Sequence, residues 1–206
     1  MRHYARRVWV ALTASLVLGT STAASVAGPV EDGNAAYQRG DYRTAVKVLQ
    51  PLVDQGNADA QDILAIMYYV GQGVPQNRAE AIRLYRLAAE QGNAHAQDAL
   101  GFAYQNGVGA QRDVGQAAKW FRKAADQDNL DAQFNLGEMC ELGNGVPQDY
   151  VLAYMWFTLV ASHGTRAYAT RGIDRVAQQM SPEQIAEAQK LAREWKPKLE
   201  REQEPI

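Results

Sequence analysis

Residues 93–128 read NAHAQDALGFAYQNGVGAQRDVGQAAKWFRKAADQD, and this stretch decides the fold because its pattern recurs on both sides of it. The blocks 57–92 and 129–164 follow in the same 36-residue register without a gap. The columns that keep one residue type in all three blocks include Ala60/Ala96/Ala132, Gln61/Gln97/Gln133, Leu64/Leu100/Leu136, Gly71/Gly107/Gly143, Gly73/Gly109/Gly145 and Ala81/Ala117/Ala153. A fixed period of this length is typical of proteins built from short, stacked helical units.

Each block reads as a helix, a glycine turn and a second helix. In the first block, Ala60, Leu64, Met67 and Tyr68 recur at helical spacing, which predicts one apolar stripe on the first helix. Gly71 is expected to end that helix, because glycine adopts the left-handed conformation at low cost. The second helices are expected to pack through small alanines and through aromatic residues.

The second helices also carry recognisable start signals. Asn77, Asp113 and Asp149 stand at equivalent positions, and each can accept a hydrogen bond from a free backbone amide as an N-cap. Asn77 with Glu80, and Asp113 with Gln116, resemble capping boxes.

These motifs resemble the Sel-one-like repeat (SLR), a relative of the tetratricopeptide repeat. The middle block matches the pattern at Ala96, Leu100, Gly101, Tyr104, Gly107, Gly109, Asp113, Ala117, Trp120, Ala124 and Ala125. Three positions depart from it: Ala65 replaces a glycine, Cys140 a tyrosine, and Asp128 the closing glycine. The resemblance implies an all-α fold, a right-handed α-solenoid of helix-turn-helix repeats.

The flanking segments are expected to be helical caps. Residues 28–56 resemble a tetratricopeptide-type helix pair that covers the front of the array. Residues 165–206 are expected to add capping helices and a tail, with one helix opened by Ser181 at the N-cap and Pro182 at N1. Ile185, Ala188, Leu191 and Trp195 should lie against the last repeat, because a terminal repeat must shield its apolar face.

Residues 1–27 resemble a signal peptide. Three arginines precede an apolar stretch that is shorter than the roughly 20 residues of a membrane-spanning helix, and small residues before Gly28 offer a cleavage site. Cleavage after Ala24, an uncleaved anchor and a twin-arginine signal are the alternatives. The sequence therefore predicts a periplasmic or secreted protein without a stable membrane anchor after cleavage.

Charge and cysteine content limit the classes of partner and of cross-link that the chain can have. After removal of residues 1–27, the chain carries 18 basic and 23 acidic side chains, a formal charge of −5, and the basic residues are scattered. This pattern argues against nucleic acid and against an anionic membrane surface as partners. The single cysteine, Cys140, excludes an intrachain disulfide and is expected to be an inert, partly buried thiol.

A partner groove is predicted on the first helices of the repeats, which line the inner surface of such solenoids. Positions at i, i+4 and i+7 that the repeat pattern does not require form one stripe in each block. The candidate groove residues are Asp62, Ile66, Tyr69, Asp98, Phe102, Gln105, Phe134, Glu138 and Glu141. The alternative is that these positions are only solvated or packing positions.

The predicted function is a protein–protein interaction scaffold or adaptor that binds a protein or peptide, with no catalytic residue, cofactor or metal site. His95 and His163 stand alone at block edges and are expected to be solvated turn residues. A cell-envelope hydrolase, or an accessory to a cell-wall enzyme, is the alternative, and a regulator that docks on a membrane complex is a third. Cysteine-rich relatives of the repeat have been linked to penicillin-like compounds, but they carry a cysteine pair in every repeat and this chain does not.

Overall fold

The computed structural model describes residues 28–164 and 167–197, and within these ranges the chain forms ten α-helices and no strand. The helices are α1 (Pro29–Gln38), α2 (Tyr42–Asp54), α3 (Ala58–Val70), α4 (Arg78–Glu90), α5 (Ala94–Asn106), α6 (Val114–Ala125), α7 (Leu130–Leu142), α8 (Tyr150–Ser162), α9 (Ala167–Ala177) and α10 (Pro182–Glu194). The predicted signal segment 1–27 and the tail residues 198–206 lie outside the described residues.

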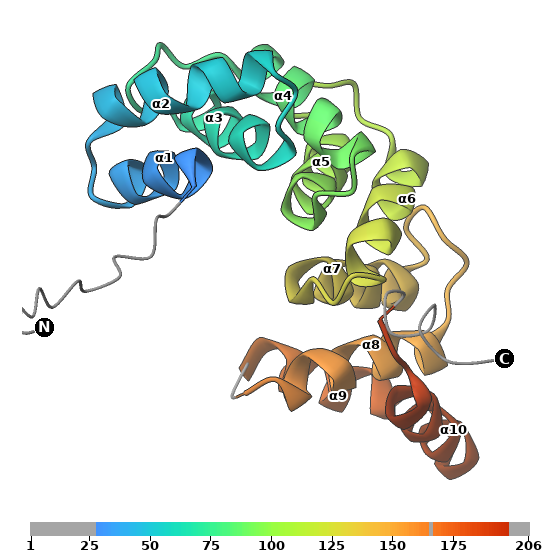
Figure 1. Cartoon of the computed structure of the whole chain (residues 1–206). Coiled ribbons are helices and arrows are strands. Elements are labelled where there is room, and N and C mark those ends of the chain that lie inside the picture. Colours follow the sequence, from blue (N-terminus) through green and yellow to red (C-terminus); the bar gives the residue numbers. More distant parts are fainter. Residues whose placement is uncertain (1–27, 165–166, 198–206) are drawn as a thin grey trace, which may run out of the picture.

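The helices form an arc of stacked pairs (Figure 1). Each helix from α1 to α8 packs on the next along the chain, and α10 packs back onto α8. The odd-numbered helices lie along the inside of the arc and α2, α4, α6 and α8 along the outside (Figure 1). The prediction of an all-α solenoid is confirmed, and the three predicted blocks contain the pairs α3–α4, α5–α6 and α7–α8.

Asparagines and glycines at fixed positions begin and end the inner helices. The Asn93 side chain accepts a hydrogen bond from the backbone N–H of Ala96 at 2.8 Å, and Gly107 ends α5 in the left-handed conformation with φ of +70°. Asn57, Asn129, Gly71 and Gly143 do the same for α3 and α7. The repeat therefore encodes its helix ends through local backbone chemistry.

Only part of the predicted capping of the outer helices is present. Asn77 and Asp113 accept from the backbone amides of Glu80 and Gln116, as N-caps do. The Glu80 side chain bonds Arg83 instead of returning to the N-cap. In the described residues, a box with both halves occurs at Ser181 and Gln184, where α10 begins.

The second glycine of each turn allows successive repeats to touch through their backbones. A Cβ atom built on Gly109 would lie 2.8 Å from the carbonyl oxygen of Arg78, at the start of the preceding outer helix. The equivalent distances are 2.9 Å from Gly73 to Tyr42 and 2.5 Å from Gly145 to Val114. Any side chain at these positions would push adjacent repeats apart.

Glycines within the inner helices make room for rings of the outer helices. A Cβ atom on Gly101 would lie 2.5 Å from Cδ1 of Phe121, and one on Gly137 would lie 2.5 Å from Cε1 of Phe157. Both rings are fully buried. The Phe121 and Phe157 rings thus pack directly on the backbones of α5 and α7.

The C-terminal helices close the last repeat as predicted. Ala188 is buried, and Ile185, Leu191 and Trp195 pack against the same cluster. The ring centroids of Trp195 and Trp156 lie 6.0 Å apart in an edge-to-face arrangement, which buries the indole of Trp156.

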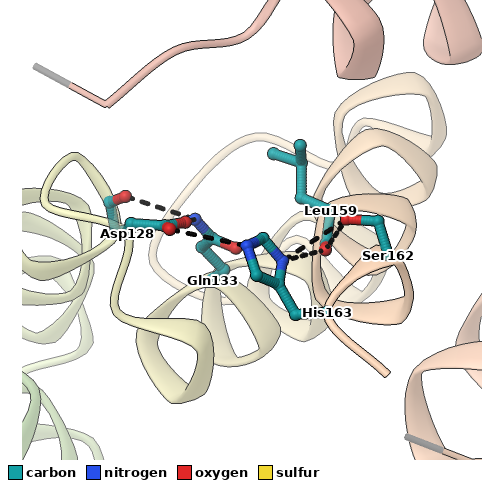
Figure 2. A network of polar contacts seen from close by, with 6 residues as sticks. Asp128, Gln133, Leu159, Ser162 and His163 are labelled. Atoms are coloured by element: carbon teal, nitrogen blue, oxygen red, sulfur yellow. Dashed lines mark hydrogen bonds and ion pairs between the residues drawn. The ribbon is translucent and has the colours of Figure 1, made fainter. Parts of the chain in front are cut away.

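Asp128 occupies a position that other repeats give to glycine. It has φ of +65°, as Gly56, Gly92 and Gly164 also have positive φ at 36-residue intervals. Its carboxylate accepts from Nε2 of Gln133 at 3.0 Å and lies 3.5 Å from Nε2 of His163 (Figure 2). These contacts offset part of the cost of a left-handed conformation in a residue other than glycine.

A buried glutamine on the inner helix of each of the first two repeats accepts a hydrogen bond from a glutamine at the end of the outer helix of the same repeat, and the third repeat lacks this bond. Oε1 of Gln61 accepts from Gln91, and Oε1 of Gln97 accepts from Gln127, both at 2.8 Å. His163 holds the equivalent donor position in the third repeat, but its ring nitrogens contact Asp128, Ser162 and the carbonyl of Leu159 (Figure 2). Oε1 of the fully buried Gln133 is left without a hydrogen-bond partner among the described residues. His163 is an exposed turn residue directly after α8, as expected from the sequence, and it also contacts Asp128.

We predict that Gly101→Ala lowers the free energy of unfolding by about 1–3 kcal/mol, because the new methyl group overlaps the Phe121 ring in a closely packed core. Gly115→Ala is the matched control, since Gly115 is also helical but meets only a carboxylate oxygen of Asp113 at 3.4 Å. That control should gain up to about 1 kcal/mol from helix propensity. Urea unfolding followed by circular dichroism measures both, and equal effects would contradict the packing argument.

We predict that His163→Gln stabilises the protein by about 1 kcal/mol, because a glutamine there can donate to the unsatisfied Oε1 of Gln133. The backbone of His163 (φ −90°, ψ 24°) resembles that of Gln91 (φ −84°, ψ 0°), so the substitution needs little rearrangement. The melting temperature should rise by roughly 2–4 °C. The reverse change, Gln91→His, should lower it, and a rise in both variants would refute the pairing.

Candidate functional site

The predicted groove residues lie on the inner helices α3, α5 and α7, but the three repeats present them differently. In the first repeat, Asp62 is 8% exposed, whereas Ile66 and Tyr69 are half-buried. The guanidinium of Arg78 lies 5.7 Å from the centroid of the Tyr69 ring. Asp62 and Ile66 contribute to a pocket, and Tyr69 lies further along α3.

In the second repeat the stripe combines an acid with an exposed aromatic ring. Phe102 is 47% exposed, which is unusual for so large an apolar side chain, and Gln105 is half-buried. Burial and the nearby charge of Asp131 raise the pKa of Asp98 to about 6, although a hydrogen bond from Asn135 at 3.3 Å and the proximity of His95 act in the opposite direction. Asp98 therefore changes charge close to neutral pH.

In the third repeat the stripe is covered by α9. The Phe134 ring packs edge-to-face on Tyr168, with centroids 4.6 Å apart, and also contacts Phe157 at 5.4 Å. Glu141 is 8% exposed and forms a two-point ion pair with Arg175. Phe134 and Glu141 thus hold α9 in place, which corrects the prediction that they face a groove.

Glu138 lies between these two contacts on α7. Burial raises the pKa of its carboxyl group, the charge of Glu141 adds to this effect, and Arg175 opposes it. Its side chain is half-buried.

The open part of the concave face contains a pocket of about 380 Å³ between α1, α3 and the start of α5. Its lining includes the apolar side chains Val30, Tyr37, Ile63 and Ile66, the charged side chains Glu31, Asp59, Asp62 and His95, and the amides Asn34 and Gln38. Three carboxylates and one imidazole therefore share a pocket that also has apolar walls.

His95 is the residue of this pocket that sequence reasoning missed. Its Nδ1 lies 2.8 Å from Oδ1 of Asp62, and the hydrogen bond to Asp62 raises the pKa of the imidazole. The side chain is 55% exposed, as expected of a solvated residue, but His95 lies in the first turn of α5 and pairs with Asp62 of α3, which the sequence analysis did not predict. The 36-residue register contained a signal, because His95 stands at the same position as Asp59 and Asp131.

The register arranges the inner surface into an acidic edge and an apolar edge. Asp62 and Asp98 occupy equivalent positions near the beginnings of α3 and α5. Ile66 and Phe102 follow one helical turn later on the same two helices. A partner crossing these helices would meet carboxylates on one side and apolar side chains on the other.

The described residues do not assemble a recognisable reaction centre. No three His, Cys, Asp or Glu side chains in residues 28–164 and 167–197 gather in a way that could hold a metal ion. Cys140 is 3% exposed, and burial raises the pKa of its thiol, which disfavours the reactive thiolate. None of the helices in these ranges has the length and apolar character needed to cross a membrane.

Comparison with known proteins identifies the repeat. A family model described as Sel1 repeat matches residues 58–93, 94–129 and 130–165, which together make up just over half of the chain. The matched units begin one residue later than the predicted blocks. No significant match was found among curated proteins.

Two solved structures are similar in both fold and sequence. A Sel1 repeat protein from Oxalobacter formigenes aligns with 71% of this chain at 34% identity and a TM-score of 0.68, and the alignment spans 58% of that protein. A second structure, c5321, is a protective antigen present in uropathogenic Escherichia coli strains and displays an SLR fold. It aligns with 72% of this chain at 29% identity and a TM-score of 0.55, over 39% of its own length.

Proteins built from these repeats are commonly protein–protein interaction scaffolds, and their fold is typically non-catalytic. The helix pairs, the glycine turns and the repeat match all agree. This chain belongs to the Sel1 repeat family.

Proposed function

We propose that this protein is an exported scaffold that binds an extended, basic and amphipathic segment of a partner protein across α1, α3 and α5. The observation that carries the proposal is Phe102, which exposes 47% of its surface on an inner helix, one repeat along from the pocket residue Ile66. Exposed aromatic side chains beside a preformed pocket are typical anchors of protein interfaces.

The charge of the surface supports a basic partner. Glu31, Asp59 and Asp62 line the pocket, and Asp98 follows on α5. A segment with positive side chains on one face and apolar side chains on the other would complement both edges of this surface. Such charge complementarity sets specificity and association rate more than it sets affinity.

The dimensions of the surface favour a short segment. Helices in contact lie about 10 Å apart, so three adjacent inner helices span roughly 20 Å. An extended chain advances about 3.3 Å per residue, and roughly six to eight residues would cross them. The segment would end before α7, since α9 covers Phe134 there.

The location is the second part of the proposal. The arginine-led apolar segment in residues 1–27 supports export, and the mature protein would act in the periplasm or outside the cell. A single cysteine is compatible with an oxidising compartment, because Cys140 is buried and has no second thiol within the chain.

We predict that a peptide of about twelve residues alternating leucine and lysine binds the full chain more tightly than the same peptide with glutamate in place of lysine, because the surface is acidic. Phe102→Ala should weaken binding of the lysine peptide about tenfold. Leu87→Ala, on the outer helix α4, is the matched control, since Leu87 is 36% exposed and should leave binding unchanged. Fluorescence anisotropy measures the affinity of the unaltered protein for both peptides and of each variant for the lysine peptide. If Phe102→Ala binds the lysine peptide as tightly as the unaltered protein does, Phe102 is not an anchor of the interface.

We predict that the protein expressed in a Gram-negative host is recovered from the periplasm with Gly28 as its first residue, as intact-mass measurement would show. Leu16→Arg places a charge in the apolar stretch and should leave the uncleaved chain in the cytoplasm. Recovery of both proteins from the cytoplasm at full length would contradict export.

A further inference from the structure

We propose that the pocket between α1, α3 and α5 holds one basic side chain of the partner segment, whose cationic head displaces the His95 imidazole from Asp62, so that binding releases a proton. The inference rests on the proposed function and adds to it the chemistry of the recognised residue and a dependence on pH.

The pocket has the form that an aliphatic stem with a charged head requires. Tyr37, Ile63 and Ile66 supply apolar walls, and Asp62 supplies the carboxylate of a side chain that is only 11% exposed. Lysine and arginine bury their methylene stems against such walls and place the charge at a polar end. An acidic side chain would meet three carboxylates and be repelled.

The present partner of Asp62 can be exchanged. The His95 side chain is 55% exposed, whereas that of Asp62 is 11% exposed, so the imidazole covers the carboxylate from the solvent side. His95 begins the first turn of α5, and rotation of its side chain toward solvent would uncover Asp62 without moving a helix. A buried carboxylate without a counter-charge is costly, so the incoming cation must replace the one that leaves.

The linkage between binding and pH has a definite sign. In the free protein, the hydrogen bond to Asp62 raises the pKa of His95. Once a cation occupies Asp62, the imidazole loses that bond and lies near a positive charge, so its pKa falls and its proton passes to the buffer. Affinity therefore rises with pH through the range between the bound-state and free-state pKa values, and levels off above it.

Other groups face His95 from each neighbouring element and contribute to the same field. They are Glu31 on α1, Asp59 and Asp62 on α3, Tyr85 on α4, Asp98 on α5 and Asp131 on α7. Of these, Asp98 also titrates near neutral pH, since its pKa is raised to about 6. Protonation of Asp98 weakens cation binding at low pH, so the two groups act with the same sign and must be separated experimentally.

The test uses two peptides that differ only in the presence of one ammonium group. Both derive from the leucine–lysine peptide, with serine at every basic position except one. That position carries lysine in the first peptide and norleucine in the second. Norleucine keeps the four-carbon stem of lysine but lacks the ammonium group. We expect the full chain to bind the lysine peptide about tenfold more tightly than its norleucine twin. Asp62→Asn should abolish that preference, whereas Glu187→Gln, an exposed change on α10, should preserve it.

Calorimetry of the lysine peptide at pH 7 in phosphate and in Tris measures the proton release, because the two buffers have different heats of ionisation. We expect a fraction of one proton released per peptide. His95→Gln should lower the number of protons released while retaining the preference for lysine. Asp98→Asn should still release the proton that comes from His95. Helix content by circular dichroism checks that each variant is folded.

The outcomes separate the inference from the function beneath it. If both peptides bind equally and binding still depends on Phe102, the scaffold proposal stands and the cation pocket is refuted. If lysine is preferred but the heats in the two buffers agree, the exchange of His95 is refuted. If neither peptide binds, both proposals fail.

Discussion

The structure depends on one close contact, that between the second glycine of each turn and the backbone of the preceding outer helix. Gly109 lies against Arg78 at a distance that leaves no room for a side chain, and Gly73 and Gly145 repeat the arrangement. Because this contact joins backbone to backbone, it fixes the spacing of successive repeats whatever their surface residues are. The concave face exists because the same offset is applied three times, and its side chains are free to vary without disturbing it.

The sequence predicted the frame well because the frame rests on local rules that recur. Asparagine N-caps, left-handed glycines and apolar stripes each act within a few residues, and the 36-residue register makes the same signal visible three times. The open surface was predicted less well, because its state depends on what a neighbouring helix covers. Phe134 and Asp98 occupy equivalent positions, yet the Phe134 ring packs on Tyr168 of α9, whereas Asp98 accepts a hydrogen bond from Asn135 of α7. No property of α7 alone distinguishes the two cases.

Departures from the repeat pattern show where local and tertiary requirements conflict. Asp128 has a left-handed backbone conformation that glycine adopts without strain, and its carboxylate accepts a hydrogen bond from the side chain of Gln133. His163 takes the place of a glutamine and turns toward Asp128, so the buried amide oxygen of Gln133 loses the donor that Gln61 and Gln97 have. One substitution therefore compensates another only in part, and the unsatisfied amide oxygen is a cost within the third repeat.

The two ends of the concave face differ in how their buried carboxylates are paired. At the C-terminal end, Glu141 of α7 and Arg175 of α9 form an ion pair within the chain, and this pair helps to hold α9 against the inner surface. At the N-terminal end, the partner of the buried Asp62 carboxylate among the described residues is His95, a side chain that solvent can reach. Both cationic side chains are about half exposed, but the guanidinium of Arg175 holds its carboxylate at two points and stays charged, whereas the imidazole of His95 makes one contact and can lose its charge. The pair of Asp62 and His95 can therefore change partners at lower cost. Recognition is therefore expected where the internal pairing is weakest, at the open end of the arc.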